Sequence, residues 1–408
     1  MNTKIRLTLM NFLQYAVWGA WLISLGAYLG STLKFAGLQI GSFFATMGIA
    51  SLFMPAVMGI IADRWIPAQR LLGLCHLFAA GFITLAATRT DYNSLYTLVL
   101  LSVMFYMPTI ALSNSVAYNA LEKAGLDTVT HFPPIRVWGT VGFICAMWVV
   151  DLGKMGLSAT QLYFSATLGL ILGLYSFTLP NCPINRSGGG KSIVDLLGLR
   201  AFALFKQRKM AIFFIFSMLL GMSLQITNAF ADGYIKSFGD TGIHGAKYLG
   251  TFGVEHSTIL ISLSQISETL CILLIPFFLK RFGIKRVMLI AMFAWVLRFA
   301  LLGAGNPGPG VWMFILSMIV YGVAFDFFNI SGSLFVEKET SAAIRSSAQG
   351  VFMIMTNGLG ALIGSYLAGW IVNHYGWPLS WYLFAGFSLV VAIVFAVIFK
   401  YKHDPNRI

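Results

Sequence analysis

The sequence predicts an all-α polytopic membrane protein with 12 transmembrane helices, arranged as two six-helix bundles. Three observations predict this fold class: an apolar composition, a series of long hydrophobic stretches, and one long polar connection near mid-chain. Hydrophobic residues make up 58% of the 408 residues, charged residues only 10%, and the mean hydropathy is +0.80. A soluble domain has about 25% charged residues, so this chain lacks the polar surface that a water-soluble protein needs.

Each helix is predicted from an apolar run, because about 20 apolar residues are needed to cross the hydrocarbon core of a bilayer. In chain order the predicted spans are 7–29, 41–62, 71–88, 94–118, 137–153, 160–180, 211–235, 257–279, 287–304, 311–335, 348–373 and 378–399. The first run follows Lys4 and Arg6, as the core of a signal peptide would. It exceeds the usual apolar core of about 7–15 residues, and further spans follow, so we expect a retained first helix.

The longest connection between spans divides the chain into two halves. The predicted domains are an N-terminal bundle of 1–180, a cytoplasmic linker of 181–210 and a C-terminal bundle of 211–408. The linker contains Pro183 and the run Gly188-Gly189-Gly190, which is typical of a flexible segment. The pattern Asn-x₇-Glu-Lys begins at Asn114 and again at Asn329, at the ends of the fourth and tenth spans. This repetition favours a duplicated transporter fold, with substrate bound near the membrane midplane between the halves.

The distribution of Lys and Arg predicts the orientation of the chain in the membrane. With a cytoplasmic N-terminus, 21 of the 27 basic residues lie at the inner ends and loops, five lie outside, and Arg298 lies within a span. Both termini are therefore expected in the cytoplasm. Because the basic residues are dispersed over short turns, the net charge of +13 reflects topology, and no nucleic acid polymer is expected as a partner.

Two acidic residues, Glu268 and Asp326, lie near the middle of the spans 257–279 and 311–335. A charge at that depth costs roughly 3 kcal/mol or more, so such residues usually face a polar cavity and mark a route for ions or solutes. Removal from water favours the protonated form of a carboxyl group, which makes both acids candidates for handling protons. The alternative for either acid is a structural ion pair with Arg298.

Four segments of the sequence resemble the bacterial nucleoside:proton symporters, the nucleoside-permease branch of the major facilitator superfamily. They are 132–140 (FPPIRVWGT), 224–228 (LQITN), 264–268 (SQISE) and 321–332 (YGVAFDFFNISG). The turns at Gly59–Arg64 and Lys280–Arg286 resemble the loop motif of that superfamily, with departures at Pro67, Ala68 and Lys280. The resemblance covers essentially the whole chain and implies uptake of nucleosides driven by the proton gradient.

The polar and aromatic residues of these segments recur three or four positions apart, which places them on common helix faces. The candidate substrate-binding residues are Arg136, Thr140, Phe143, Gln225, Asn228, Gln265, Glu268, Phe325 and Asp326. Hydroxyl, amide, carboxylate and aromatic groups suit the ribose, the base edge and the base ring of a nucleoside.

Each of these assignments has a structural alternative. Gln225 and Asn228 could hydrogen-bond between helices as packing contacts. Thr140 could bond its own backbone, Phe143 and Phe325 could be plain packing residues, and Arg136 could reach lipid phosphates.

The predicted function is proton-coupled nucleoside uptake across the bacterial inner membrane by alternating access. Nucleosides (purine, pyrimidine or both), protons and the lipid bilayer are the expected partners, the chain is expected to act as a monomer, and neither a cofactor nor a metal is expected. Glu268 and Asp326 are the candidate proton-coupling residues, and Asp326 is favoured as the carrier.

Three other functions compete with this one. A proton symporter for another polar solute such as a sugar would suit the same residues, and only the resemblance decides against it. An intramembrane aspartyl protease would leave the internal repeat unexplained, and no filter sequence indicates a channel. No enzymatic activity is therefore expected.

Overall fold

The computed structural model describes residues 2–184, 199–244, 246–341 and 344–401, which are almost entirely helical. Nine helical stretches in those ranges are long and apolar enough to cross a membrane. Two shorter helices, α1 (Thr3–Gly19) and α7 (Thr160–Ser176), coincide with further predicted spans, and α12 (Ser257–Ala304) covers two of them. The structure is therefore compatible with the predicted 12 spans.

Contacts between residues divide the chain into two compact units. Unit 1 comprises Met1–Phe35 and Thr46–Leu197, and unit 2 comprises Ala36–Ala45 and Gly198–Ile408. Helix α3 (Gly37–Arg64) belongs to both units, because its first residues pack closely on helix α15 (Ala361–Tyr375) of unit 2. The central part of the predicted linker, 185–198, lies outside the described residues.

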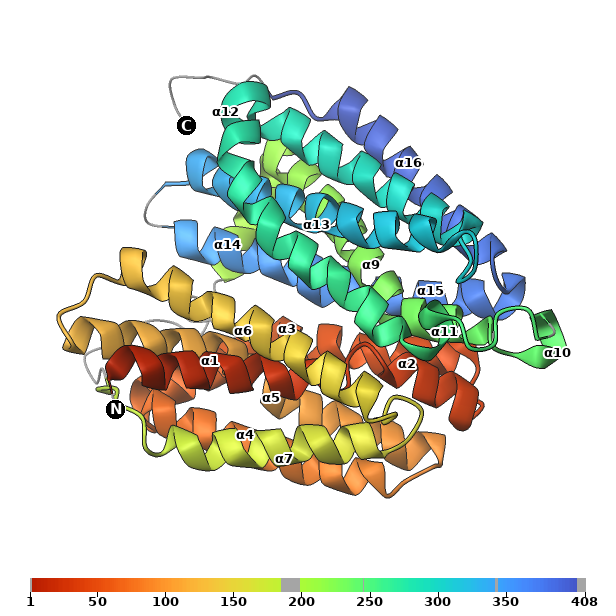
Figure 1. Cartoon of the computed structure of the whole chain (residues 1–408). Helices are drawn as coiled ribbons and strands as arrows, with labels where there is room; N and C mark the ends of the chain where they lie inside the picture. Colours follow the sequence, from red (N-terminus) through yellow and green to blue (C-terminus); the bar gives the residue numbers. More distant parts are fainter. Residues whose placement is uncertain (1, 185–198, 245, 342–343, 402–408) are drawn as a thin grey trace. The chain divides into compact units, whose positions relative to one another are not determined.

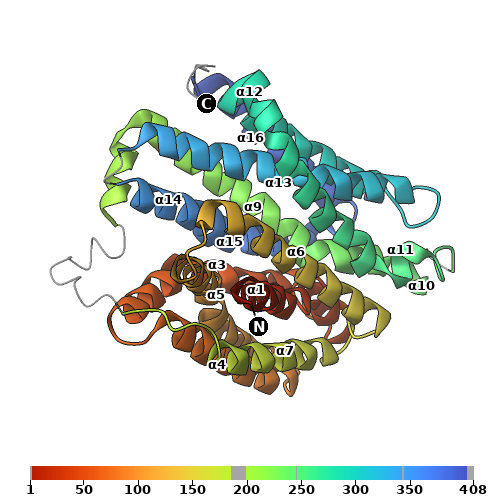
Figure 2. The same ribbon diagram turned by 60° about the vertical axis from the view of Figure 1, so that its left-hand side comes forward.

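Unit 1 is built from long helices that lie side by side (Figures 1 and 2). Besides α1, α3 and α7 they are α4 (Ala68–Ala87), α5 (Tyr92–Lys123) and α6 (Thr128–Leu152). Helix α1 packs on α6 and α7, and α4 packs on α5 and α7. The side chain of Asp91 accepts a hydrogen bond from the backbone N–H of Ser94 at 2.9 Å, which caps α5 and holds the pKa of that carboxyl below its usual range.

The first predicted span is interrupted in the structure. Helix α1 ends at Gly19, a turn follows at residues 20–24, and the chain re-enters a helix at α2 (Leu25–Ala27), which continues into a π-helix, η1 (Tyr28–Thr32). The apolar run continues through the turn, so hydropathy alone did not locate the break.

Unit 2 contains the remaining helices. They are η2 (Leu199–Lys206), α9 (Arg208–Ser237), α10 (Thr241–His244), α11 (Phe252–Glu255), α12, α13 (Val311–Glu339), α14 (Arg345–Met353), the π-helix η3 (Ile354–Gly360), α15 and α16 (Leu379–Ile398). Helix α12 packs along α13 and α16, and α9 packs against η3 and α15.

Helix α12 contains the turn between the predicted spans 257–279 and 287–304. Gly283 has φ 74° and ψ 166°, so the helical path is broken there. Positive φ angles strain residues that carry a Cβ atom, which explains a glycine at this position. The two arms of α12 are therefore separate helices in geometry.

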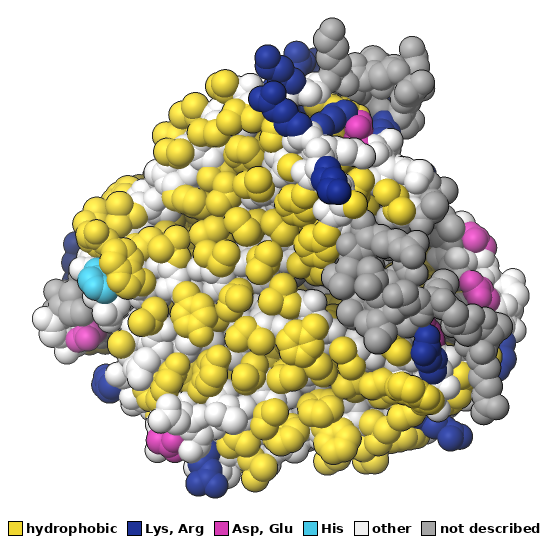
Figure 3. Space-filling model, turned by 180° about the vertical axis from the view of Figure 1, so that it is seen from behind, with side chains coloured by type: hydrophobic (Ala, Val, Ile, Leu, Met, Phe, Trp, Pro, Cys, Tyr) yellow, Lys and Arg dark blue, Asp and Glu magenta, His cyan; other side chains and the backbone are white. Residues whose placement is uncertain are grey.

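The surface is apolar over a wide area. Hydrophobic side chains cover most of the face in Figure 3, and Lys and Arg side chains lie towards its margins. Leu273 and Val397, for example, are 75% and 68% exposed. Exposed apolar surface of this extent marks an interaction with lipid or protein, and here it fits a multi-pass membrane protein.

Candidate functional site

The two predicted acids lie on neighbouring helices of unit 2. Asp326 of α13 is 4% exposed, and its Oδ2 atom has no hydrogen-bond partner among the residues that the structure describes. Glu268 of α12 is half-buried and close enough to Asp326 for the two carboxyl groups to interact electrostatically. The helices approach closely at Gly322, where an added Cβ atom would lie 2.6 Å from the carbonyl carbon of Ser267. This close helix contact holds the carboxyl groups of Glu268 and Asp326 near each other within unit 2.

The predicted amides of unit 2 also carry unpaired atoms. Gln225 of α9 is 6% exposed, and Gln265 of α12 is half-buried. The Oε1 atoms of both are buried and accept no hydrogen bond from any described group. Leaving such an acceptor unsatisfied costs about 1–3 kcal/mol, so these oxygens call for a partner. Asn228, one turn after Gln225, is half-buried as well.

An aromatic pair adjoins the acids. The rings of Tyr321 and Phe325 are stacked, with centroids 5.7 Å apart and planes 6° apart. Tyr321 interacts electrostatically with both Glu268 and Asp326. Tyr321 lies in the sequence motif 321–332 but is not among the predicted site residues. Its position four residues before Phe325, on the same helix face, was the available signal.

Neutral groups hold Arg298 in place. Its Nη1 atom donates a hydrogen bond to the carbonyl oxygen of Ser317 at 2.7 Å, and the guanidinium lies 4.6 Å from the ring centroid of Tyr321. Among the described residues, no ion pair joins Arg298 to Asp326, and Tyr321 interacts with both the guanidinium and the acids. These contacts give Arg298 a structural role that does not depend on an ion pair with Asp326.

The predicted residues of unit 1 lie along helix α6. Arg136 places its guanidinium 4.0 Å from the ring centroid of Tyr15, a cation–π contact. The hydroxyl of Thr140 forms no hydrogen bond with any described residue, so the alternative of a bond to its own backbone is not observed. Phe143 is 8% exposed and meets the indole of Trp18 edge-on, at 6.3 Å between ring centroids.

Next to Trp18, a buried polar network joins three helices of unit 1, α1, α4 and α5. Gln14 Nε2 donates to Thr109 Oγ1 at 2.7 Å, and His76 Nε2 lies 2.8 Å from Gln14 Oε1. Tyr106 donates to the backbone oxygen of Gln14 at 2.7 Å, and its ring lies 5.8 Å from that of Trp18. The network fixes α1 against α4 and α5. An amide inside an apolar span was the signal that could have pointed to Gln14.

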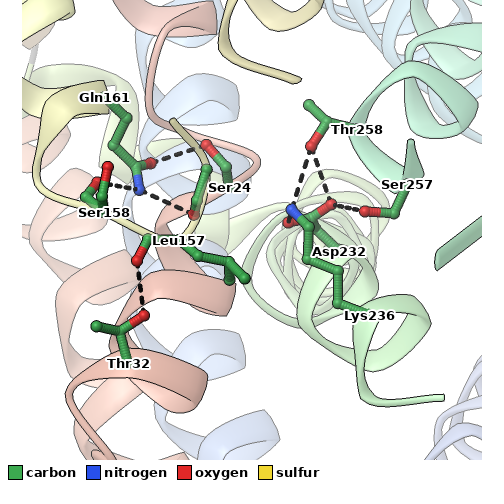
Figure 4. Close-up of polar contacts among 10 residues, drawn as sticks. Ser24, Thr32, Leu157, Ser158, Gln161, Asp232, Lys236, Ser257 and Thr258 are labelled. Carbon is green, nitrogen blue, oxygen red and sulfur yellow. Dashed lines mark hydrogen bonds and ion pairs between the residues drawn. The ribbon is translucent and has the colours of Figure 1, made fainter. Parts of the chain in front are cut away.

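Two further polar clusters appear in Figure 4, and neither was predicted. In unit 1, Ser24 donates to Gln161 Oε1 at 2.8 Å. In unit 2, Asp232 accepts hydrogen bonds from Ser257 at 2.6 Å and Thr258 at 3.1 Å, and it pairs with Lys236 at 2.6 Å. The second cluster fastens the end of α9 to the start of α12.

Comparison with known proteins identifies the family. The family model described as "Nucleoside H+ symporter" matches residues 1–404. The chain belongs to this family. It is 50% identical to the nucleoside permease NupG of Escherichia coli over 99% of this chain and 97% of that protein, and 49% identical to the xanthosine permease of the same organism over 100% and 98%. The crystal structure of the nucleoside transporter NupG superposes with a TM-score of 0.91 at 50% identity, covering 98% of this chain and 100% of that one.

Membership of the nucleoside H+ symporter family confirms the predicted class of protein. The chain is a multi-pass membrane transporter and not an enzyme, and the match to the NupG structure confirms the predicted major facilitator fold. Proton-coupled nucleoside uptake is the function of the family, and the alternative of a sugar symporter is not favoured.

Proposed function

We propose that this chain imports nucleosides together with protons across the inner membrane of a bacterium, as a monomer with both termini in the cytoplasm. The orientation is supported by the excess of Lys and Arg in the expected inner loops. Residues 1–180 and 211–408 would form the two halves, joined by the linker 181–210.

The proposed nucleoside contacts come from both units. Arg136, Thr140 and Phe143 are the candidates of unit 1. The candidates of unit 2 are Gln225, Asn228, Gln265, Glu268, Phe325 and Asp326. The observation that carries the proposal is the set of buried oxygens on Gln225, Gln265 and Asp326, which have no partner in the described parts of the chain. A nucleoside supplies hydroxyl and N–H donors for these acceptors.

Asp326 is proposed as the proton carrier, and Glu268 as the acid that senses its charge. Two carboxyls that repel each other tend to share one proton, because ionising both at short distance is unfavourable. Proton loading of Asp326 would then neutralise that carboxyl group and remove its repulsion with Glu268 while a nucleoside is bound. Release of the proton would restore the repulsion and reset the site.

The test is transport by purified protein in lipid vesicles with an imposed pH gradient. Asp326→Asn and Glu268→Gln should each abolish uphill accumulation of labelled uridine and adenosine, because the neutral amide cannot cycle a proton. Asp326→Asn should still exchange labelled for unlabelled nucleoside, because its binding amides remain. The exposed Glu255 provides a control, and Glu255→Gln should accumulate nucleoside normally.

Full gradient-driven accumulation by both acid variants would refute the proton role. Unlabelled sugars should not compete with uridine, whereas unlabelled nucleosides should. Competition by a sugar at similar concentration would favour the alternative substrate class.

A further inference from the structure

A hollow in unit 2 adjoins the proposed site and contains polar side chains with no role assigned so far. Residues of α9, α13 and the π-helix η3 line it, among them Leu224, Phe325, Phe328, Asn329, Thr356 and Asn357. It encloses about 290 Å³ when its open side is counted. Most of this is open space, and the enclosed part is only about 20 Å³, so the hollow has room for an exocyclic oxygen or amino group at the edge of a base and not for a whole ring.

The two asparagines that line the hollow have unused hydrogen-bonding capacity. Asn329 forms no hydrogen bond with a described residue, and Asn357 has only a long contact, 3.7 Å from its Nδ2 to Met353 Sδ. The hydroxyl of Thr356, by contrast, is satisfied by the backbone oxygen of Phe352 at 2.9 Å. Each amide presents both a donor and an acceptor, and both asparagines are half-buried.

The backbone around Asn357 is firmly supported. An added Cβ atom at Gly221 of α9 would lie 2.8 Å from Thr356 Cα, so the two backbones touch immediately beside Asn357. The turn that carries Asn357 is π-helical, a geometry that is rare and frequently found at functional sites. The backbone that carries Asn357 is therefore fixed against α9, and it could move only if η3 separated from α9.

The chemistry of the hollow matches the edge of a nucleobase. Phe325 and Phe328 provide apolar ring faces, against which a flat heterocycle packs. An asparagine amide can donate and accept at once, as it does when it reads the N6 and N7 atoms of adenine. It can equally meet the N–H and carbonyl groups of a pyrimidine.

We propose that this hollow receives the edge of the nucleobase, and that Asn329 and Asn357 hydrogen-bond its exocyclic groups. The inference rests on the proposed function, since it names the part of the same substrate that these residues contact. Because each amide can act as a hydrogen-bond donor or as an acceptor, the two asparagines would accept both purine and pyrimidine nucleosides.

The test removes single groups from both the substrate and the protein. KM for transport is compared between adenosine and purine riboside, which lacks the C6 amino group, and between uridine and its analogue without O4. In the wild type, loss of the exocyclic group should raise KM about tenfold, the effect of one hydrogen bond. In Asn357→Ala or Asn329→Ala, that ratio should fall close to one for the group that the deleted amide contacts.

Two further variants keep the result interpretable. Asn119 of α5 is a half-buried asparagine whose amide is satisfied by Ser115 at 2.9 Å, so Asn119→Ala should keep the wild-type ratios. Asn357→Asp preserves size and has only acceptors when the carboxyl is ionised, so at high pH it should favour adenosine, with its amino donor, over uridine.

A wild-type ratio near one, or unchanged ratios in both alanine variants, would overturn the inference. Uphill accumulation of uridine by the wild type and its loss in Asp326→Asn test the proposed function separately. If accumulation occurs and the ratios do not respond, only the base-edge assignment fails. If no nucleoside accumulates at all, the proposed function fails.

Discussion

Asp232 is a buried carboxylate whose oxygens are both occupied. It is 1% exposed, accepts hydrogen bonds from Ser257 and Thr258 through Oδ1, and meets Lys236 through Oδ2 (Figure 4). Breaking a buried ion pair by removing one partner costs about 3–5 kcal/mol, whereas replacing both partners by neutral groups costs much less. The ion pair therefore makes two side chains of α9 depend on each other, and Ser257 and Thr258 provide the contact with α12.

Lys236→Met should lower the free energy of unfolding in detergent by about 3 kcal/mol, because it leaves the Asp232 charge buried and uncompensated. The double variant Asp232→Asn/Lys236→Met should be more stable than Lys236→Met alone. The measurement is a double-mutant cycle from denaturant unfolding. The more exposed pair Lys209–Glu339, 2.7 Å apart, is the matched control and should couple by about 1 kcal/mol or less. Additive effects at Asp232 and Lys236 would contradict the prediction.

At the residue scale, depth in the membrane was the informative signal. Glu268 and Asp326 stood out because a carboxylate at mid-span is costly wherever the helix packs. Asp232 lies near a helix end, where a charge can often reach water, so its burial depends on Ser257 and Thr258 of another helix. Asn357 was missed for a similar reason, since only the packing of α9 on η3 makes it part of a hollow.

Between elements, α13 approaches α12 closely at Gly322, near the two acids. The hydroxyl of Ser267 also donates a hydrogen bond to the backbone oxygen of Ile319 across the same contact. Ser267 directly precedes Glu268, and Gly322 lies one turn before Asp326. The spacing of the two carboxyls is therefore set by a position that has no room for a side chain.

Gly322→Ala should destabilise the protein by about 1–3 kcal/mol, the usual effect of overpacking, and reduce proton-driven accumulation because the acids are displaced. Gly386 of α16 is the control, since an added Cβ atom there meets nothing within 4 Å. Gly386→Ala should stabilise its helix by up to about 1 kcal/mol and leave transport unchanged. Thermal unfolding and vesicle uptake measure both effects. Equal behaviour of the two variants would show that the contact at Gly322 is unimportant.

Helices were predictable as apolar stretches, but their interruptions were not. The break after Gly19 and the π-helices η1 and η3 leave hydropathy unchanged, because they alter the hydrogen-bonding pattern of an equally apolar chain. The turn at Gly283 was predictable because basic residues and a glycine interrupt the apolar sequence there.

At the scale of the whole molecule, the membrane potential sets how far a nucleoside can be concentrated. One proton moving with a neutral nucleoside carries one charge, and about 100 mV, negative inside, provides about 2.3 kcal/mol. Wild-type vesicles with this potential and no pH gradient should therefore accumulate uridine roughly 40-fold. Uptake of labelled uridine at several imposed potentials measures this, with Asp326→Asn as the control that should not respond. An accumulation ratio independent of potential would exclude net charge movement.

The fold class followed from composition because a bilayer permits few architectures: backbone polar groups must be satisfied within helices or closed barrels. The assignment of residues 36–45 to unit 2 did not follow from the sequence. It depends on how closely Gly37 and Gly41 of α3 approach Gly369 and Ser365 of α15, which hydropathy does not encode.

The unpaired oxygens of Gln225, Gln265 and Asp326 bear on protein engineering. Directed evolution for heat resistance would select apolar replacements such as leucine at these positions, because they remove a desolvation penalty from the empty carrier. Such stabilised proteins would crystallise and express well, but they would not transport nucleosides. Transport here is thus maintained at the expense of robustness, and a stabilisation screen needs an uptake assay alongside it.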